Sequence, residues 1–426
     1  MWARDLHRCT LRWNRYRLRR RVSPGPLSRH ETGQHPLGRY PDYCFCHRSN
    51  FCDAVSRGLQ YLVYIAEKIL YKNPKYINYL APVVTYVLTI FAGTGHTAFS
   101  MIPVIVEVAK GENIRPSVPL SIAVVATQIV ITASPVSAAV IYMTGVLEPF
   151  GWSYPELLGI WILTTFLGCM ITSFIRTHIS KMDLSSDPVY QERLKEGLVK
   201  PPVGLQDMKI TSSAKLSVWI FLIGVLCVVF YASAISPAVG LIKPVIVPRD
   251  AAIMSLMLAV GALITILCKV KPEDIAGTSV FKSGMVACIC VLGVAWLGDT
   301  FVSGHTKEIK DFASQTISQY PVLLAVVFFL PAMLLYSQVA TAKPITPTVD
   351  AALGITAASP DNSYMLVACF RTVRSTDLSD TARRSTDGRY RYNTNRKGVF
   401  NYSFFIPGVL AIFFSVALGF AVCGLI

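Results

Sequence analysis

Two successive apolar stretches, residues 77–109 and 117–147, are each long enough to cross a bilayer, yet each is interrupted near its middle. A membrane-spanning helix needs ~20 mostly apolar residues. The interruptions read Gly93-Thr94-Gly95-His96-Thr97 and Thr132-Ala133-Ser134-Pro135. A break at membrane depth exposes backbone N–H and C=O groups, so protein, trapped water or a ligand must satisfy them.

Two interpretations of such a break compete. A single Gly/Pro interruption is often a kink packed against its neighbours. Secondary transporters, in contrast, use broken helices as binding sites, because the amino end of a half-helix carries partial positive charge and free N–H groups. Two breaks in direct succession favour the second interpretation, a site for a small anion.

The composition predicts the class of fold. The chain is 53% hydrophobic and 15% charged, against roughly 25% charged residues in soluble domains. We therefore expect an all-α, polytopic membrane protein with about nine to eleven crossing or re-entrant elements. The apolar segments are residues 77–109, 117–147, 154–175, 216–235, 251–268, 285–301, 320–336 and 404–426.

The formal net charge of +15 is concentrated in two segments. Residues 1–58 hold 12 arginines against four acidic residues, and residues 371–398 hold eight Lys/Arg against three. The membrane body is therefore nearly neutral. We predict the lipid bilayer as partner and no nucleic acid, although a high net charge would otherwise suggest one.

Cysteine usage predicts neither disulfides nor a metal site. Most cysteines outside the first segment lie in apolar runs, where they behave as small hydrophobes. Cys44, Cys46, His47 and Cys52 lie close together, but their spacing matches no standard zinc motif. We expect no metal and no cofactor.

A polar linker and an internal repeat divide the chain. The predicted order is a basic, disordered segment 1–58, a first membrane half 59–177, a linker 178–215, a second half 216–370, a basic segment 371–398 and a C-terminal helix 399–426. At an offset of 244 residues, Thr97 aligns with Thr341 and Pro103 with Pro347. Corresponding Gly/Pro-interrupted segments in two halves indicate a transporter's site, so we predict two inverted repeats with broken helices or re-entrant hairpins.

Several runs resemble one family closely. LAPVVTYVLTIFAGTGH, AVVATQIVITASPVSAAVIYM, ACICVLGVAWLGDTFVS and LLYSQVATAK resemble the anaerobic C4-dicarboxylate transporters, the Dcu family, most closely the A type within its A and B types. The resemblance implies a multi-pass protein of the bacterial inner membrane that exchanges fumarate, malate, aspartate and succinate. It covers about residues 61–370 and 399–426.

The two basic segments depart from that family, whose members are apolar at both places. Both segments keep the length of what they replace, so we hypothesise a frameshifted gene and expect a chain with little or no transport. Compensating insertions and deletions near codons 58, 371 and 398 would have to accompany such shifts.

The predicted substrate-binding residues come from three groups. They are Thr94, Gly95, His96 and Thr97 of the first break; Thr132, Ser134, Pro135 and Ser137 of the second; and Ser337, Gln338, Thr341 and Lys343 of the second half. Their hydroxyls, amides and single cation suit a carboxylate. Structural alternatives stay open for Lys343, which can extend to the membrane surface, and for His96.

The sequence also bears on three other functions. No catalytic motif is present, so we predict that the chain is not an enzyme and has no catalytic residues. A channel would show charged rings or a periodic small-residue lining, which the sequence lacks. A carrier of another small organic or inorganic anion is the main alternative, and a homo-oligomer is compatible with either.

Overall fold

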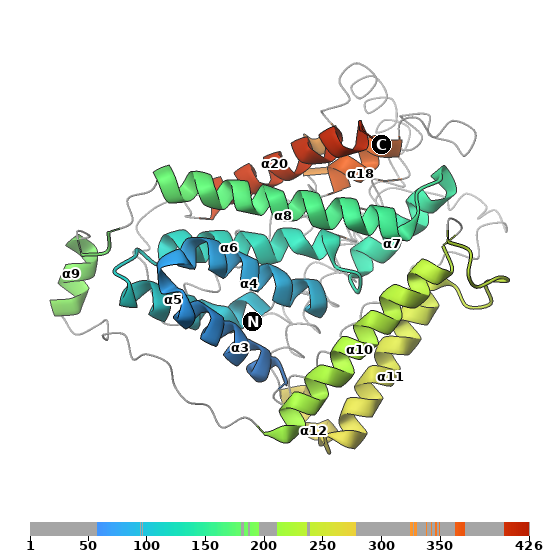
Figure 1. The fold of residues 1–426 in the computed structure, drawn as a ribbon, viewed down its shortest axis with the longest axis horizontal. Helices are drawn as coiled ribbons and strands as arrows, with labels where there is room; N and C mark the ends of the chain where they lie inside the picture. Colours follow the sequence, from blue (N-terminus) through green and yellow to red (C-terminus); the bar gives the residue numbers. More distant parts are fainter. Residues whose placement is uncertain are drawn as a thin grey trace, which may run out of the picture. The chain divides into compact units, whose positions relative to one another are not determined.

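Figure 1 shows the computed structural model of the chain, whose described part consists of helices joined by turns and loops, with one isolated bridge between Ile114 and Asp183. All described residues belong to one compact unit, Pro41–Ile426. They are residues 58–93, 95, 97–179, 183–185, 188–195, 211–236, 239–277, 324–326, 328–329, 338, 342, 346, 349, 363–370 and 404–425. The predicted all-α fold class is confirmed.

The element bounds follow the apolar segments of the sequence. The helices are α3 (Gly58–Lys72), α4 (Ile77–Ala92), α5 (Thr97–Gly111), α6 (Ser117–Ile129), α7 (Ala138–Leu147), α8 (Tyr154–Ile179), α9 (Pro188–Lys195), α10 (Ser212–Ala234), α11 (Arg249–Leu267), α12 (Pro272–Gly277), α18 (Ser363–Cys369) and α20 (Phe405–Cys423). Short 3₁₀ turns are η2 (Pro74–Tyr76), η3 (Val130–Ala133) and η4 (Glu148–Phe150).

Three helices in the described part of the chain, α8, α10 and α20, are long and apolar enough to cross a membrane. Each corresponds to a predicted segment. The segments 77–109 and 117–147 instead form two helices each, as their interruptions predict. The segments 285–301 and 320–336 lie outside the described residues, apart from a few helical positions in the second.

Helices α8 and α20 lie side by side, and α18 packs with them (Figure 1). Trp161 of α8 is fully buried and donates its indole N–H to the carbonyl of Val367 at 3.1 Å. Its ring lies 4.9 Å from the ring of Phe370. A buried indole needs such a partner, so this contact fixes α18 on α8.

Helix α4 packs on α6, and both contact α8. Threonines in these apolar helices donate to their own backbone: Thr85 to Ala81 at 2.9 Å and Thr172 to Gly168 at 2.8 Å. This bonding satisfies a hydroxyl where water is absent.

Helices α10 and α11 pair along their lengths (Figure 1). One face of α10 exposes large apolar side chains at helical spacing, namely Leu216, Trp219, Ile223, Leu226 and Phe230. An exposed apolar stripe of this length is costly in water and favourable in lipid. The stripe agrees with the predicted membrane protein.

Several predicted features lie outside the described residues. Residues 1–57 and 371–398 are among them, as is about half of the second half, so the inverted repeat stays a prediction. Within the predicted linker the structure describes α9 and residues 183–185.

Candidate functional site

The first predicted break lies between α4 and α5 and is confirmed. Helix α4 ends at Gly93, whose φ of 64° is left-handed and whose N–H donates to the carbonyl of Thr89 at 2.8 Å. Glycine adopts this conformation without the steric cost that other residues meet. Helix α5 then begins at Thr97.

The second predicted break is confirmed between η3 and α7. Ser134 is extended, with φ −84° and ψ 128°, and Pro135 has no N–H to continue a helix. Ser137 is extended again and precedes α7, without a side-chain capping bond. The amino end of α7 therefore starts inside the protein, at buried residues.

The two breaks contact each other. The Ser134 hydroxyl donates to the carbonyl of Ile90, in the last turn of α4, at 2.6 Å. A Cβ atom added to Gly93 would lie 2.7 Å from Cγ2 of Val136, closer than packed atoms tolerate. Glycine is required at position 93 both by its backbone conformation and by this close approach.

A buried amide lies beside the first break. Gln128 of α6 is 3% exposed. A Cβ atom built on Gly95 would lie 2.9 Å from its Nε2 and 3.0 Å from its Oε1. The absence of a side chain at Gly95 thus lets a primary amide reach the break.

Sequence reasoning missed Gln128. The sequence does contain a signal for a buried polar site at this position. Gln128 is a polar residue in the middle of the apolar run 117–133, four residues before Thr132 and therefore on the same helix face. An amide buried in such a run needs polar partners.

The predicted residues of the second break are all buried and lie together in one short segment. The Thr132 hydroxyl donates to Ile129 at 2.7 Å, and the Ser134 hydroxyl to Ile90. The carbonyl of Pro135 accepts from the Tyr154 hydroxyl at 3.3 Å. Both hydroxyl protons therefore stabilise the break itself in this conformation.

Most other predicted residues cannot be placed. Thr94, His96, Ser337, Thr341 and Lys343 lie outside the described residues, as does the side chain of Thr97.

Of the four predicted binding residues in the second half, the structure describes Gln338. It is 4% exposed, and its Nε2 has no hydrogen-bond partner in the part of the chain that the structure describes. A buried amide left without a partner costs ~1–3 kcal/mol. A polar ligand atom would remove that cost.

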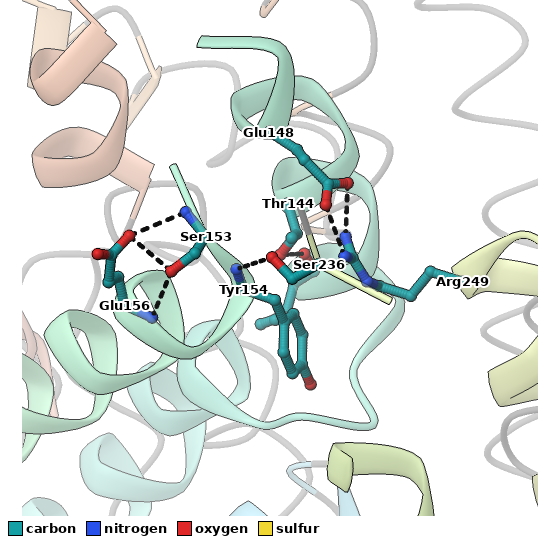
Figure 2. A network of polar contacts seen from close by, with 8 residues as sticks. Thr144, Glu148, Ser153, Tyr154, Glu156, Ser236 and Arg249 are labelled. Carbon is teal, nitrogen blue, oxygen red and sulfur yellow. Dashed lines mark hydrogen bonds and ion pairs between the residues drawn. The ribbon is translucent and has the colours of Figure 1, made fainter. Parts of the chain in front are cut away.

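A charged network lies next to the second break (Figure 2). Arg249, at the start of α11, binds Glu148 of η4 through both terminal nitrogens, at 2.9 and 2.8 Å. Its guanidinium carbon lies 5.2 Å from the centre of the Tyr154 ring. Sequence reasoning did not identify these residues.

Within the described residues, no group of three or more His, Cys, Asp or Glu side chains could hold a metal ion. The site instead offers backbone N–H groups, primary amides and hydroxyls at buried helix breaks. These are donors for an anion's oxygen atoms. Secondary transporters build their binding sites from apolar helices with breaks of this kind.

Comparison with known proteins gives the family. Residues 53–426 match the family described as anaerobic C4-dicarboxylate membrane transporter. The chain therefore belongs to that family, and it is a polytopic membrane transporter and not an enzyme. The matched range begins within the first basic segment and includes the second.

Curated relatives carry the same description. The chain is 56% identical over 373 residues to "C4-dicarboxylate transporter DcuA" of Helicobacter pylori strain J99, covering 87% of this chain and 84% of the relative. It is 47% identical over 367 residues to the DcuA of Escherichia coli K12, with 86% and 84% covered. Identity to "Anaerobic C4-dicarboxylate transporter DcuB" of Escherichia coli O6:H1 is 34% over 382 residues, with 85% and 83% covered. The greater likeness to the A type agrees with the resemblance of the sequence.

Proposed function

We propose that this chain is built to exchange C4-dicarboxylates, among them fumarate, malate, aspartate and succinate, across the bacterial inner membrane. The names of its relatives support the substrate class. The two basic segments lower the transport rate of this particular chain, because they replace apolar membrane segments of the family.

The contact between the two breaks is the observation that carries this proposal. It places the amino ends of α5 and α7 at neighbouring interruptions, which are joined through Ser134 and Ile90. A short dicarboxylate carries a negative charge at each end, so a site with two separated sets of donors suits it better than one set.

The predicted residues then have distinct roles. Backbone N–H groups near Gly95 and Ser137 bind the carboxylates, and the Gln128 amide adds a donor beside the first break. Gln338, whose buried Nε2 has no partner among the described residues, contributes from the second half, as do Thr341 and Lys343. Exchange follows when the two halves move about this site so that it opens to one side at a time.

Labelled exchange in proteoliposomes tests the proposal. The vesicles contain purified chain whose residues 1–58 and 371–398 are replaced by the corresponding segments of the Helicobacter pylori relative. They should take up labelled fumarate faster when they contain succinate than when they are empty, because a loaded carrier returns faster than an empty one. Uptake indifferent to internal succinate would contradict exchange and indicate a channel. If an inorganic anion inside the vesicles accelerated uptake and no dicarboxylate did, the proposed substrate class would be wrong.

A substitution at Gln128 tests its membership of the site. Gln128→Met keeps the length of the side chain and removes its amide group, so dicarboxylate affinity should fall roughly ten-fold, as for one charge-assisted hydrogen bond. Isothermal titration of purified chain with succinate measures this. Unchanged affinity would remove Gln128 from the site.

The proposal includes a homo-oligomer. The apolar stripe on α10 fits either lipid or a second copy of the chain. Native mass spectrometry from detergent distinguishes them, and a monomer at all concentrations would contradict the oligomer.

A further inference from the structure

We propose that Tyr154 is a positioning residue of the site: it fixes the Pro135 peptide, so that the N–H of Val136 is presented to a substrate carboxylate, and the Arg249–Glu148 pair holds Tyr154 in place. This inference rests on the proposed function for the identity of the ligand. Tyr154, Arg249 and Glu148 are not among the predicted binding residues.

The geometry of one peptide unit carries the inference. In a planar trans peptide, the carbonyl of one residue and the N–H of the next point in opposite directions. The Tyr154 hydroxyl donates to the Pro135 carbonyl at 3.3 Å, which sets the direction of the Val136 N–H. Among the described residues this N–H donates to no backbone carbonyl, although Val136 is buried.

Such an N–H is rare inside a protein. Buried backbone donors are nearly always paired, so an exception calls for a ligand or a cost. It lies in the extended segment between η3 and α7, two residues before the first residue of a helix. The positive end of the α7 dipole adds to its attraction for a carboxylate.

Tyr154 is held from three sides. Its ring is fully buried with Arg249 5.2 Å from the ring centre, its hydroxyl binds the break, and its own N–H donates to the Ser236 hydroxyl at 3.4 Å. Figure 2 shows Tyr154 next to the Arg249–Glu148 pair, with its backbone N–H directed at Ser236. A side chain fixed in this way has little freedom to release the Pro135 carbonyl.

The Arg249–Glu148 pair is unusual for its place in the protein. Arg249 is 9% exposed, and its Nε has no hydrogen-bond partner in the described structure. Burying a charge is costly even when it is paired, and an apolar pair of the same size is often as stable. The bidentate hydrogen bonds instead fix the orientation of Arg249 relative to Glu148, because a planar guanidinium forms two parallel bonds to a carboxylate in only one arrangement.

The pair also connects distant parts of the sequence. Glu148 follows α7, which starts at the second break, whereas Arg249 begins α11 after the α10–α11 connection. A shift of α11 relative to α7 would therefore change the position of Tyr154 and, through it, of the Val136 N–H. The direction of the Val136 N–H therefore depends on how α7 and α11 are arranged.

The test compares two tyrosine-to-phenylalanine variants of the full chain. Tyr154→Phe removes only the hydroxyl that binds Pro135. Tyr86→Phe is the matched control: Tyr86 is also buried, and its hydroxyl donates to the carbonyl of Ile162 at 2.9 Å, joining α4 to α8 and not to the break. The Tyr86 hydroxyl also lies 2.8 Å from the Thr165 hydroxyl, so Tyr86→Phe disturbs at least as many buried hydrogen bonds as Tyr154→Phe.

Two readouts are measured on both variants in lipid nanodiscs. Hydrogen–deuterium exchange of the peptide that covers residues 130–140 should increase several-fold in Tyr154→Phe and stay unchanged in Tyr86→Phe. Succinate affinity should fall roughly two- to ten-fold in Tyr154→Phe only, in proportion to one neutral hydrogen bond. Equal behaviour of the two variants in both readouts would overturn the positioning role.

Arg249→Lys tests the pair separately. Lysine keeps the positive charge but cannot form the two parallel hydrogen bonds, so exchange of residues 130–140 should increase in the same direction as in Tyr154→Phe. Exchange equal to that of the unsubstituted chain would contradict the role of the pair.

The experiment distinguishes this inference from the proposed function. If the unsubstituted chain binds no dicarboxylate, the proposed function fails, whereas the exchange data still decide whether Tyr154 and Arg249 hold the break. If it binds succinate and Tyr154→Phe binds it equally well, only the positioning inference fails.

Discussion

Replacing Gly93 with alanine should damage the contact between the two breaks. The φ of 64° costs a residue with a Cβ ~1–2 kcal/mol. The new methyl group would also lie 2.7 Å from Cγ2 of Val136 and 3.5 Å from the Ser134 hydroxyl. Overpacking of this kind costs ~1–3 kcal/mol, so the total loss in free energy of unfolding is about 2–5 kcal/mol.

Gly151→Ala is the matched control for this prediction. Gly151 has a φ of 92°, but nothing lies within 4 Å of an added Cβ. It should therefore lose only the backbone part, ~1–2 kcal/mol. The difference between the two variants isolates the close approach of the breaks.

Unfolding of purified protein in mixed SDS and detergent micelles measures both free energies. A second substitution, Val136→Ala, removes the atom that the new methyl group meets, so Gly93→Ala should cost less in that background. Equal losses for Gly93→Ala and Gly151→Ala, with no coupling to Val136, would refute the packing of one break on the other.

Three further outcomes are expected. Thr97→Val and Thr341→Val should each weaken succinate binding roughly ten-fold, as for a charge-assisted hydrogen bond of ~1.5–3 kcal/mol; two unchanged affinities in titration would exclude both hydroxyls. Lys343→Gln should weaken dianions more than a monoanion, because a fixed cation interacts more strongly with the doubly charged ligand; equal losses would indicate a structural role. Replacing residues 1–58 and 371–398 with the corresponding segments of the Helicobacter pylori relative should raise fumarate exchange at matched abundance. Residues 371–398 carry 11 charges in 28 positions, and each Lys or Arg at the centre of a bilayer costs about 2.5–3.5 kcal/mol. Equal exchange rates would contradict the interpretation of these segments as damage.

The helices of this fold were predictable because membrane insertion depends on local composition. The segment 154–175 became α8 and 216–235 became α10, each within four residues at either end. Both breaks were also predictable, since Gly93 and Pro135 disturb a helix wherever they occur.

The contacts of the site were not predictable in the same way. Ser134 was assigned to substrate on its chemistry, but whether its hydroxyl donates to a ligand or to Ile90 depends on how α4 approaches the second break. Arg249 lies beside Pro248 at the edge of an apolar run, where a charge ordinarily marks the membrane surface. Its partner Glu148 is 101 residues away, and no local pattern relates the two.

The unequal lengths of α8 and α20 have a consequence for the membrane around them. The two helices pack together, yet α8 has 26 residues and α20 has 19, which at 1.5 Å per residue are about 39 and 28 Å long. The last turn of α8 carries Arg176 and His178, which suit the polar surface of a bilayer. The shorter helix therefore sets the hydrophobic thickness of the protein. Bilayers thicker than about 28 Å must thin locally around α20, so lipid chain length becomes a variable that controls the stability of this carrier.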